Sequence, residues 1–151
     1  MKFRFGLEKV LQHRKIVEDL AQKDFQEAQA ALNLEIQKLE DMNKAVVSAR
    51  DEAYRLQSEG GKNKTPALGQ IDDFIQGQDL RKESKRKKIK ACESLVESYR
   101  EILRQRAIES KIMIELKDKK KTEFQVEQKK REQKFVDEMN VMRFRKEESK
   151  T

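Results

Sequence analysis

Residues 60–77 read GGKNKTPALGQIDDFIQG and hold four of the chain's five glycines together with its only proline, Pro66. Glycine and proline interrupt helices, so their concentration in one window predicts a single turn region between two long helices. Gly60 and Gly61 suit the end of the first helix, because glycine tolerates the left-handed backbone found there. Thr65 followed by Pro66 is typical of an N-cap and the first residue of a helix.

The composition of the rest of the chain agrees with this reading. Of 151 residues, 42% are charged and 36% are hydrophobic, whereas globular domains have about 25% charged and about 45–50% apolar residues. A compact core of this size would need more apolar surface, and a sheet protein would need turn residues throughout. The composition therefore predicts an all-α chain with a narrow apolar seam.

Several functional classes are disfavoured by the residue types. The chain has one cysteine, Cys92, and one histidine, His13, whereas metal sites and nucleophile–base pairs draw heavily on both. No run approaches the roughly 18 apolar residues of a membrane span, and the basic N-terminus is not followed by the apolar segment of a signal peptide. We expect no enzyme, no cofactor and no metal, and a reducing cytoplasmic setting.

Seven-residue periodicity predicts a coiled coil. In the first helix, thirteen of sixteen positions are apolar in a register that shifts once, between Ala31 and Leu32, which is a stutter. The register comprises positions 7, 10, 14, 17, 21, 24, 28 and 31, then 32, 35, 39, 42, 46, 49, 53 and 56. In the second helix the seam is Ile89, Cys92, Val96, Tyr99, Leu103, Arg106, Ser110 and Met113. Cys92 is therefore expected to act as a small apolar seam residue.

Two helices joined by a short turn should lie antiparallel. We expect one domain over residues 1–151, with a helix over about 4–58, a turn region over about 59–70 and a longer C-terminal helix over about 71–147. Gly69 and Gly77 leave open a later start of the second helix, near Asp79. Folding back about residue 63 places Phe3 opposite roughly residue 123, and about twenty residues then project alone by about 30 Å, or about half that with the later start.

The projecting part carries Phe135, Met139, Met142 and Phe144. Large apolar side chains in water forfeit about 1.5–3 kcal/mol each relative to burial, so a partner should cover them, either by self-association or by insertion into a cavity. Residues 81–151 have a net charge of +9, with a dense patch over residues 85–90. This patch is either a solvated face or a docking surface for an acidic groove, nucleic acid or a membrane surface.

The opening segment suggests a family. It resembles the N-terminal signature of FliJ proteins, through Phe3-Arg4-Phe5-Gly6-Leu7-Glu8-Lys9-Val10-Leu11-Gln12-His13-Arg14 followed by Glu18 and Ala21. These are small coiled-coil components of the bacterial flagellar type III export apparatus. Length, the single break and the basic second half are similar as well.

The resemblance implies a stalk like that of rotary ATPases, whose terminal end enters the hexameric export ATPase. It implies further binding to the cytoplasmic domain of the large export-gate membrane protein and to substrate-specific export chaperones. It also implies a cytoplasmic location at the inner-membrane face of the flagellar basal body, with membrane contact only through partners. The implied ATPase-ring contacts are Phe3, Arg4, Phe5, Phe135, Met139, Met142, Arg143, Phe144 and Arg145.

The family's gate contact lies at the start of the second helix, where Ile71, Phe74 and Ile75 match its pattern and Gln78 departs from it. The alternative is that these three residues pack over the hairpin tip. Two other functions remain open: the equivalent stalk of a virulence-type secretion system, and a basic coiled-coil tether or nucleic-acid-binding protein. The patch at residues 85–90 has no recognition motif and no aromatic platform for bases, so we expect no nucleic acid.

Overall fold

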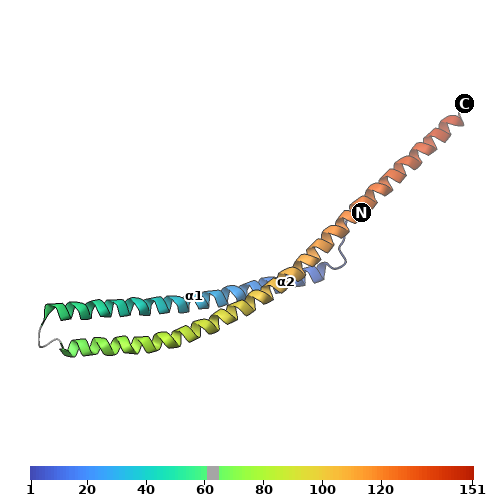
Figure 1. The fold of residues 1–151 in the computed structure, drawn as a ribbon. Coiled ribbons are helices and arrows are strands. Elements are labelled where there is room, and N and C mark those ends of the chain that lie inside the picture. The colour runs from blue at the N-terminus through green and yellow to red at the C-terminus, as the bar shows by residue number, and fades with distance from the viewer. Residues whose placement is uncertain (61–64) are drawn as a thin grey trace. The chain divides into compact units, whose positions relative to one another are not determined.

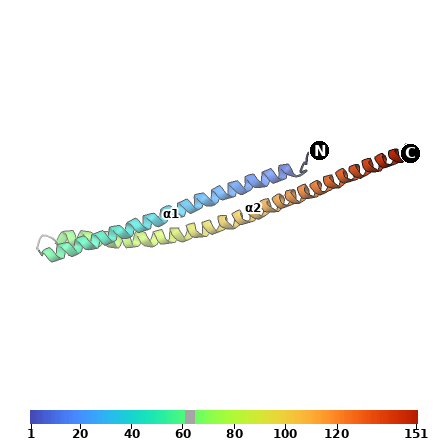
Figure 2. The same cartoon turned by 90° about the horizontal axis from the view of Figure 1, so that it is seen from above.

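The computed structural model describes residues 1–60 and 65–151, which form two helices, α1 (Glu8–Glu59) and α2 (Thr65–Glu148). No strand occurs in these two ranges. With 84 residues against 52, α2 is the longer helix, and the expected all-α, antiparallel two-helix hairpin is confirmed. Two compact units are present, Met1–Glu18 with Gln105–Thr151, and Asp19–Arg104, and each is described by itself. In the second unit, α1 and α2 run side by side in both views (Figure 1, Figure 2).

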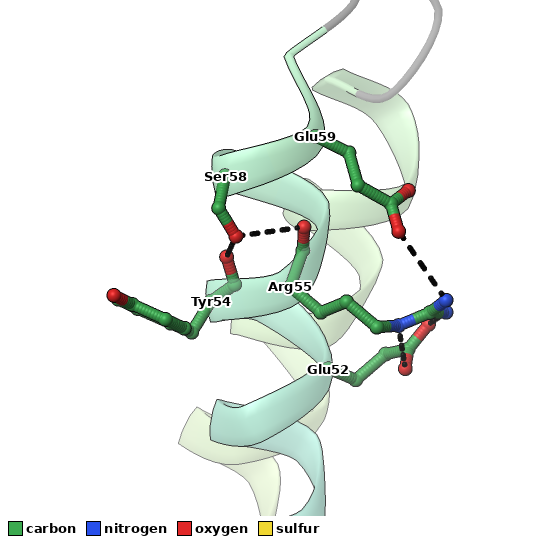
Figure 3. A network of polar contacts seen from close by, with 5 residues as sticks. All are labelled: Glu52, Tyr54, Arg55, Ser58 and Glu59. Atoms are coloured by element: carbon green, nitrogen blue, oxygen red, sulfur yellow. Dashed lines mark hydrogen bonds and ion pairs between the residues drawn. The ribbon is translucent and has the colours of Figure 1, made fainter.

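Helix α1 ends as the glycines predict. Gly60 directly follows the last helical residue and has a φ of 58°, the left-handed conformation of a helix cap. Gly61 lies outside the described residues. In the last turns, shown in Figure 3, the Ser58 hydroxyl donates to the carbonyl oxygens of Tyr54 (2.8 Å) and Arg55 (3.2 Å).

The same turns hold a small ion-pair network. The Arg55 guanidinium donates through Nε to Glu52 Oε2 at 3.1 Å and lies 3.6 Å from Glu59 Oε1 (Figure 3). The hydrogen bond from Arg55 lowers the pKa of Glu52 below its ordinary value. These pairs lie along one helix at its exposed end, so they support the helix locally and do not join it to α2.

Helix α2 begins where the Thr65-Pro66 pair indicates, and earlier than the expected bounds of the turn region. The turn region was expected to reach residue 70, or even Asp79, because of Gly69 and Gly77, but the helix starts at Thr65 and contains both glycines. A glycine inside a helix costs about 1 kcal/mol relative to alanine. Packing of an apolar face outweighs that cost in a long helix, and Ile71 and Ile75 are half-buried around these glycines.

The core of the Asp19–Arg104 unit is the predicted seam. Its buried members are Ala28 and Leu32 of α1 and Ile89 and Val96 of α2, with Phe25, Leu39, Cys92 and Tyr99 packed against them. Cys92 is a half-buried seam residue, as expected. The Arg100 guanidinium lies 5.7 Å from the centre of the Phe25 ring, where a cation is attracted to the aromatic face. All eight predicted seam positions from Ile89 to Met113 are buried or half-buried.

The predicted stutter in α1 is wrong. Of the predicted seam positions 7, 10, 17, 24 and 31, only Val17 is half-buried, and Leu7, Val10, Asp24 and Ala31 are exposed. Instead, buried and half-buried positions follow one another at alternating spacings of three and four residues without interruption: Leu11, Arg14, Glu18, Ala21, Phe25, Ala28, Leu32, Glu35, Leu39, Met42, Val46, Ala49, Ala53 and Leu56. Burying Leu11 and Phe25 removes more apolar surface from water than burying Val10 and Asp24, which favours the unbroken register.

One seam position holds a buried charge. The Glu35 side chain is almost fully buried and meets three lysines: its carboxylate oxygens lie 2.7 Å from Lys85 Nζ, 3.3 Å from Lys38 Nζ and 3.5 Å from Lys88 Nζ. The hydrogen bond from Lys85, assisted by Lys38, lowers the pKa of Glu35 to about 2. Because a buried carboxylate needs its partner opposite, this layer favours a single pairing register of the two helices.

In the other unit, α1 and α2 are also antiparallel, with a more polar seam. Leu11 and Met113 are buried, but so is Ser110, whose hydroxyl makes no hydrogen bond to any described residue. Arg14 occupies a seam position and donates from Nη1 to the carbonyl oxygen of Glu109 at 3.1 Å. These contacts join the first turns of α1 to the middle of α2.

The register of α1 is tested by adjacent substitutions. Leu11 is 1% exposed and Val10 is 40% exposed. We expect Leu11→Ala to reduce the free energy of unfolding by about 2–5 kcal/mol, because it leaves a cavity, and Val10→Ala to change it by less than about 0.5 kcal/mol. Urea denaturation followed by circular dichroism measures both. An equal or larger loss for Val10→Ala would favour the shifted register.

The Glu35 layer predicts a specific acid sensitivity. Because the folded-state pKa of Glu35 is about 2, below its ordinary value of 4.5, its ion pairs stabilise the fold above about pH 4.5, and this contribution is lost as the pH falls toward 2. Glu35→Gln should lower the denaturation midpoint at neutral pH and flatten its decline between pH 4.5 and 2. Glu40→Gln, which changes an exposed carboxyl of the same helix, should keep the wild-type pH profile. Identical profiles for all three proteins would contradict this assignment.

Candidate functional site

The N-terminal segment, residues 1–7, lies against α2. The Phe3 ring centre is 5.6 Å from that of Phe124, with the rings tilted by 50°, a favourable aromatic arrangement. The prediction that Phe3 lies opposite roughly residue 123 is thus confirmed. Phe5 is also half-buried, and its carbonyl oxygen accepts a hydrogen bond of 3.2 Å from the Glu8 backbone N–H.

The segment forms one wall of an open groove of about 480 Å³. Its apolar lining comes from Phe3, Phe5, Leu7, Leu116 and Phe124, and its polar rim from Arg4, Lys120, Glu123 and Glu127. Beside the groove, an ion pair of 2.8 Å between Lys117 Nζ and Glu8 Oε2 joins the start of α1 to α2. Phe3 and Phe5 are therefore partly used inside the chain, while Arg4 stays exposed.

The end of α2 is different, because every residue from 129 to 151 is exposed. Phe135 and Phe144 are each 64% exposed, and Met139, Met142, Val136 and Val141 are exposed too. Arg143 and Arg145 are exposed and make no ion pair with any described residue. We call residues 135–145 the C-terminal tip.

The apolar residues of the tip do not lie on a single face of the helix. With 3.6 residues per turn, Met139 and Met142 lie on the same face as Phe135. Phe144 follows Phe135 by nine residues, or two and a half turns, and so lies on the opposite face. Val141 lies toward that second face as well. The tip is therefore apolar on both sides of the helix.

The structure separates the nine predicted ATPase-ring residues into two surfaces. Phe3, Arg4 and Phe5 lie beside Phe124, whereas Phe135 follows Phe124 by eleven residues, about 16 Å along the helix. Leu116 and Phe124 were not among the predicted site residues. The signal for Phe124 was present, because it is one of only two apolar residues between Lys117 and Lys134, and it falls next to the expected partner position of Phe3.

The start of α2 holds the predicted gate residues. Ile71 and Ile75 are half-buried and line an open hollow together with Ala53 and Gln57 of α1. Phe74 is 39% exposed and is not part of that lining. The three residues thus divide: the two isoleucines pack between the helices, and the aromatic ring remains accessible.

The basic patch at residues 85–90 is partly used within the fold. Lys85 and Lys88 both pair with Glu35, and Arg86 pairs with Glu83 on its own helix, so three of its five cations are already engaged. Among the described residues, no group of histidine, cysteine, aspartate and glutamate side chains could hold a metal ion. Neither described helix contains a stretch long and apolar enough to cross a membrane.

Comparison with known proteins adds the family. Neither the curated proteins nor the solved structures contain a match to the chain. A family model described as the flagellar FliJ protein matches residues 3–149. The match covers both helices, the N-terminal segment and the C-terminal tip, and it agrees with the resemblance carried by residues 3–14. The chain belongs to the flagellar FliJ protein family.

Proposed function

We propose that this FliJ-family chain is a non-enzymatic stalk of flagellar protein export, which inserts its C-terminal tip into the ring of the export ATPase. Family membership makes it a coiled-coil protein related to flagellar export. The observation that supports the finer proposal is the exposed tip, which carries large apolar residues on both faces of the helix.

A helix with large apolar side chains on two opposite faces calls for a partner that contacts both faces. A coiled-coil partner or a flat docking surface would cover Phe135, Met139 and Met142 and leave Phe144 in water. The central opening of a ring covers all faces at once. Arg143 and Arg145, exposed beside these apolar residues, are suited to pair with carboxylates lining such an opening.

The consequence for the ATPase is a difference between its subunits. A rod with different side chains on each face cannot contact six equivalent subunits alike. It therefore stabilises different conformations in different subunits, and a difference in affinity between conformations is what shifts an equilibrium. This is how a stalk without catalytic groups would promote assembly and turnover of the ring.

The start of α2 is proposed to bind the cytoplasmic domain of the export-gate protein, mainly through Phe74. Its exposed ring offers a contact, whereas Ile71 and Ile75 are already packed. Substrate-specific chaperones are further proposed partners. Peripheral association with the basal body would then follow from these protein contacts.

The tip is tested by a triple variant, Phe135→Ala/Met142→Ala/Phe144→Ala. Each side chain is worth about 1.5–3 kcal/mol when buried, and about 1.4 kcal/mol is tenfold in affinity. We expect binding to the ATPase ring to weaken by more than about 100-fold, and stimulation of ATP hydrolysis to be lost at equal protein concentration. Titration of the purified ATPase with the full-length chain measures both.

A matched control removes three other exposed apolar side chains: Ile16→Ala/Val47→Ala/Leu80→Ala. It should stimulate the ATPase like the wild type. Undiminished stimulation by the tip variant, or equal losses in both triple variants, would rule out insertion of the tip.

The gate contact is tested by Phe74→Ala. Because the ring is exposed, the substitution should leave the thermal midpoint nearly unchanged, whereas binding to the cytoplasmic domain of the gate protein should fall at least about tenfold. Leu80→Ala, another exposed apolar residue of α2, is the control and should bind normally. Normal binding by Phe74→Ala, measured by calorimetry, would remove this residue from the contact.

A further inference from the structure

One flank of the hairpin in the Asp19–Arg104 unit is marked by Lys38 of α1 and Lys88 of α2. Both lysines reach the same carboxylate, that of Glu35, so they lie on the same side of the helix pair. Met42, Arg81, Ser84, Lys85 and Lys88 line a shallow hollow on this side. We call it the Lys38/Lys88 flank.

Apolar residues continue along this flank from both helices. On α1, the apolar residues of this face precede Lys38 by 4, 7 and 18 residues: Leu34, Ala31 and Leu20. On α2, they follow Lys88 by 3, 7 and 14 residues: Ala91, Leu95 and Ile102. These spacings keep the side chains on one face of each helix. All six are exposed. Because the helices are antiparallel, Leu34 and Ala31 lie near Ala91 and Leu95, and the row extends for about four turns.

The other flank is polar except for Ile36. Its positions beside the seam are Gln22, Gln29, Ile36, Asn43 and Arg50 on α1 and Asp79, Arg86, Glu93 and Arg100 on α2. In a chain that is 42% charged, the Lys38/Lys88 flank carries no charge on α2 from Ala91 to Ile102. An apolar column beside the two seam columns is typical of helices that pack in a larger bundle.

Charge is distributed unevenly along the same flank. At one end, Glu35 is surrounded by three lysines, which leaves an excess of positive charge. Toward the other end, Asp24 and Glu27 are exposed and make no ion pair with the residues that the structure describes. Asp24 precedes Ala31 by seven residues and Lys38 follows it by seven, so acid and base stand symmetrically about the apolar centre.

We propose that the Lys38/Lys88 flank binds a second copy of this chain in antiparallel orientation, about a two-fold axis near Ala31. In that arrangement Asp24 of each copy meets Lys38 of the other, and the exposed leucine, isoleucine and alanine side chains pack between them. The same surface serves both copies, as a two-fold interface requires. A parallel arrangement would bring Lys38 of one copy toward Lys88 of the other, and like charges oppose it.

Sedimentation equilibrium of the full-length chain across the micromolar range tests this. The wild type should dimerise, and more weakly as salt is raised. Asp24→Lys should weaken dimerisation at least about tenfold, because it sets two lysines opposite each other. The charge swap Asp24→Lys/Lys38→Asp should restore it, while Lys85 and Lys88 still hold Glu35.

The apolar centre has a matched pair of variants on α1. Leu34 is 56% exposed on the flank, and Val47 is 55% exposed away from it. Leu34→Glu should abolish the dimer and Val47→Glu should not, with equal helix content by circular dichroism. The tip variant Phe135→Ala/Met142→Ala/Phe144→Ala should still dimerise, which separates this inference from ATPase binding. A monomeric wild type, a dimer that survives Leu34→Glu, or one lost only in the tip variant would overturn the proposal.

Discussion

The narrow seam between α1 and α2 is the constraint from which the rest of this molecule follows. Only eight hydrophobic residues of the described chain are buried, and all of them occupy seam positions, five on α1 and three on α2. Two helices in contact can bury little more than two columns of side chains each. Every additional apolar column, and every turn of helix beyond the paired region, must therefore stay in water or find another protein.

Polar residues within the seam reduce the apolar surface that is buried, but they favour one pairing register of the two helices. A seam of small and aliphatic residues alone tolerates sliding by a heptad, since Ala, Leu and Val follow one another at equivalent positions. Glu35 removes that freedom, because its carboxylate is satisfied only opposite Lys85 and Lys88. Near the start of α1, Arg14 is satisfied within the seam by the backbone carbonyl oxygen of Glu109.

The sequence was sufficient for the architecture and for most of α2. Clustered glycines and one proline located the break, and the row from Ile89 to Met113 was identified residue by residue. The seam also indicated where the exposed tip begins, but the 3.6-residue turn of the helix places Phe144 on the face opposite Phe135. The contacts of Arg4, Arg143 and Arg145 with another protein are properties of a complex, which no pattern in a single chain contains.

The wrong register predicted for α1 has a physical cause, and this cause also concerns the exposed Lys38/Lys88 flank. Positions 10, 17, 24 and 31 hold Val, Val, Asp and Ala, and positions 11, 18, 25 and 32 hold Leu, Glu, Phe and Leu, so each column is apolar at three of four places. Counting apolar residues therefore does not show which column lies in the seam. The larger side chains of Leu11, Phe25 and Leu32 decide it, because they bury more apolar surface. The column left outside contains both Asp24 and Ala31, which belong to the Lys38/Lys88 flank. An ambiguous register thus indicates a helix with three apolar columns, one more than a single partner helix can cover.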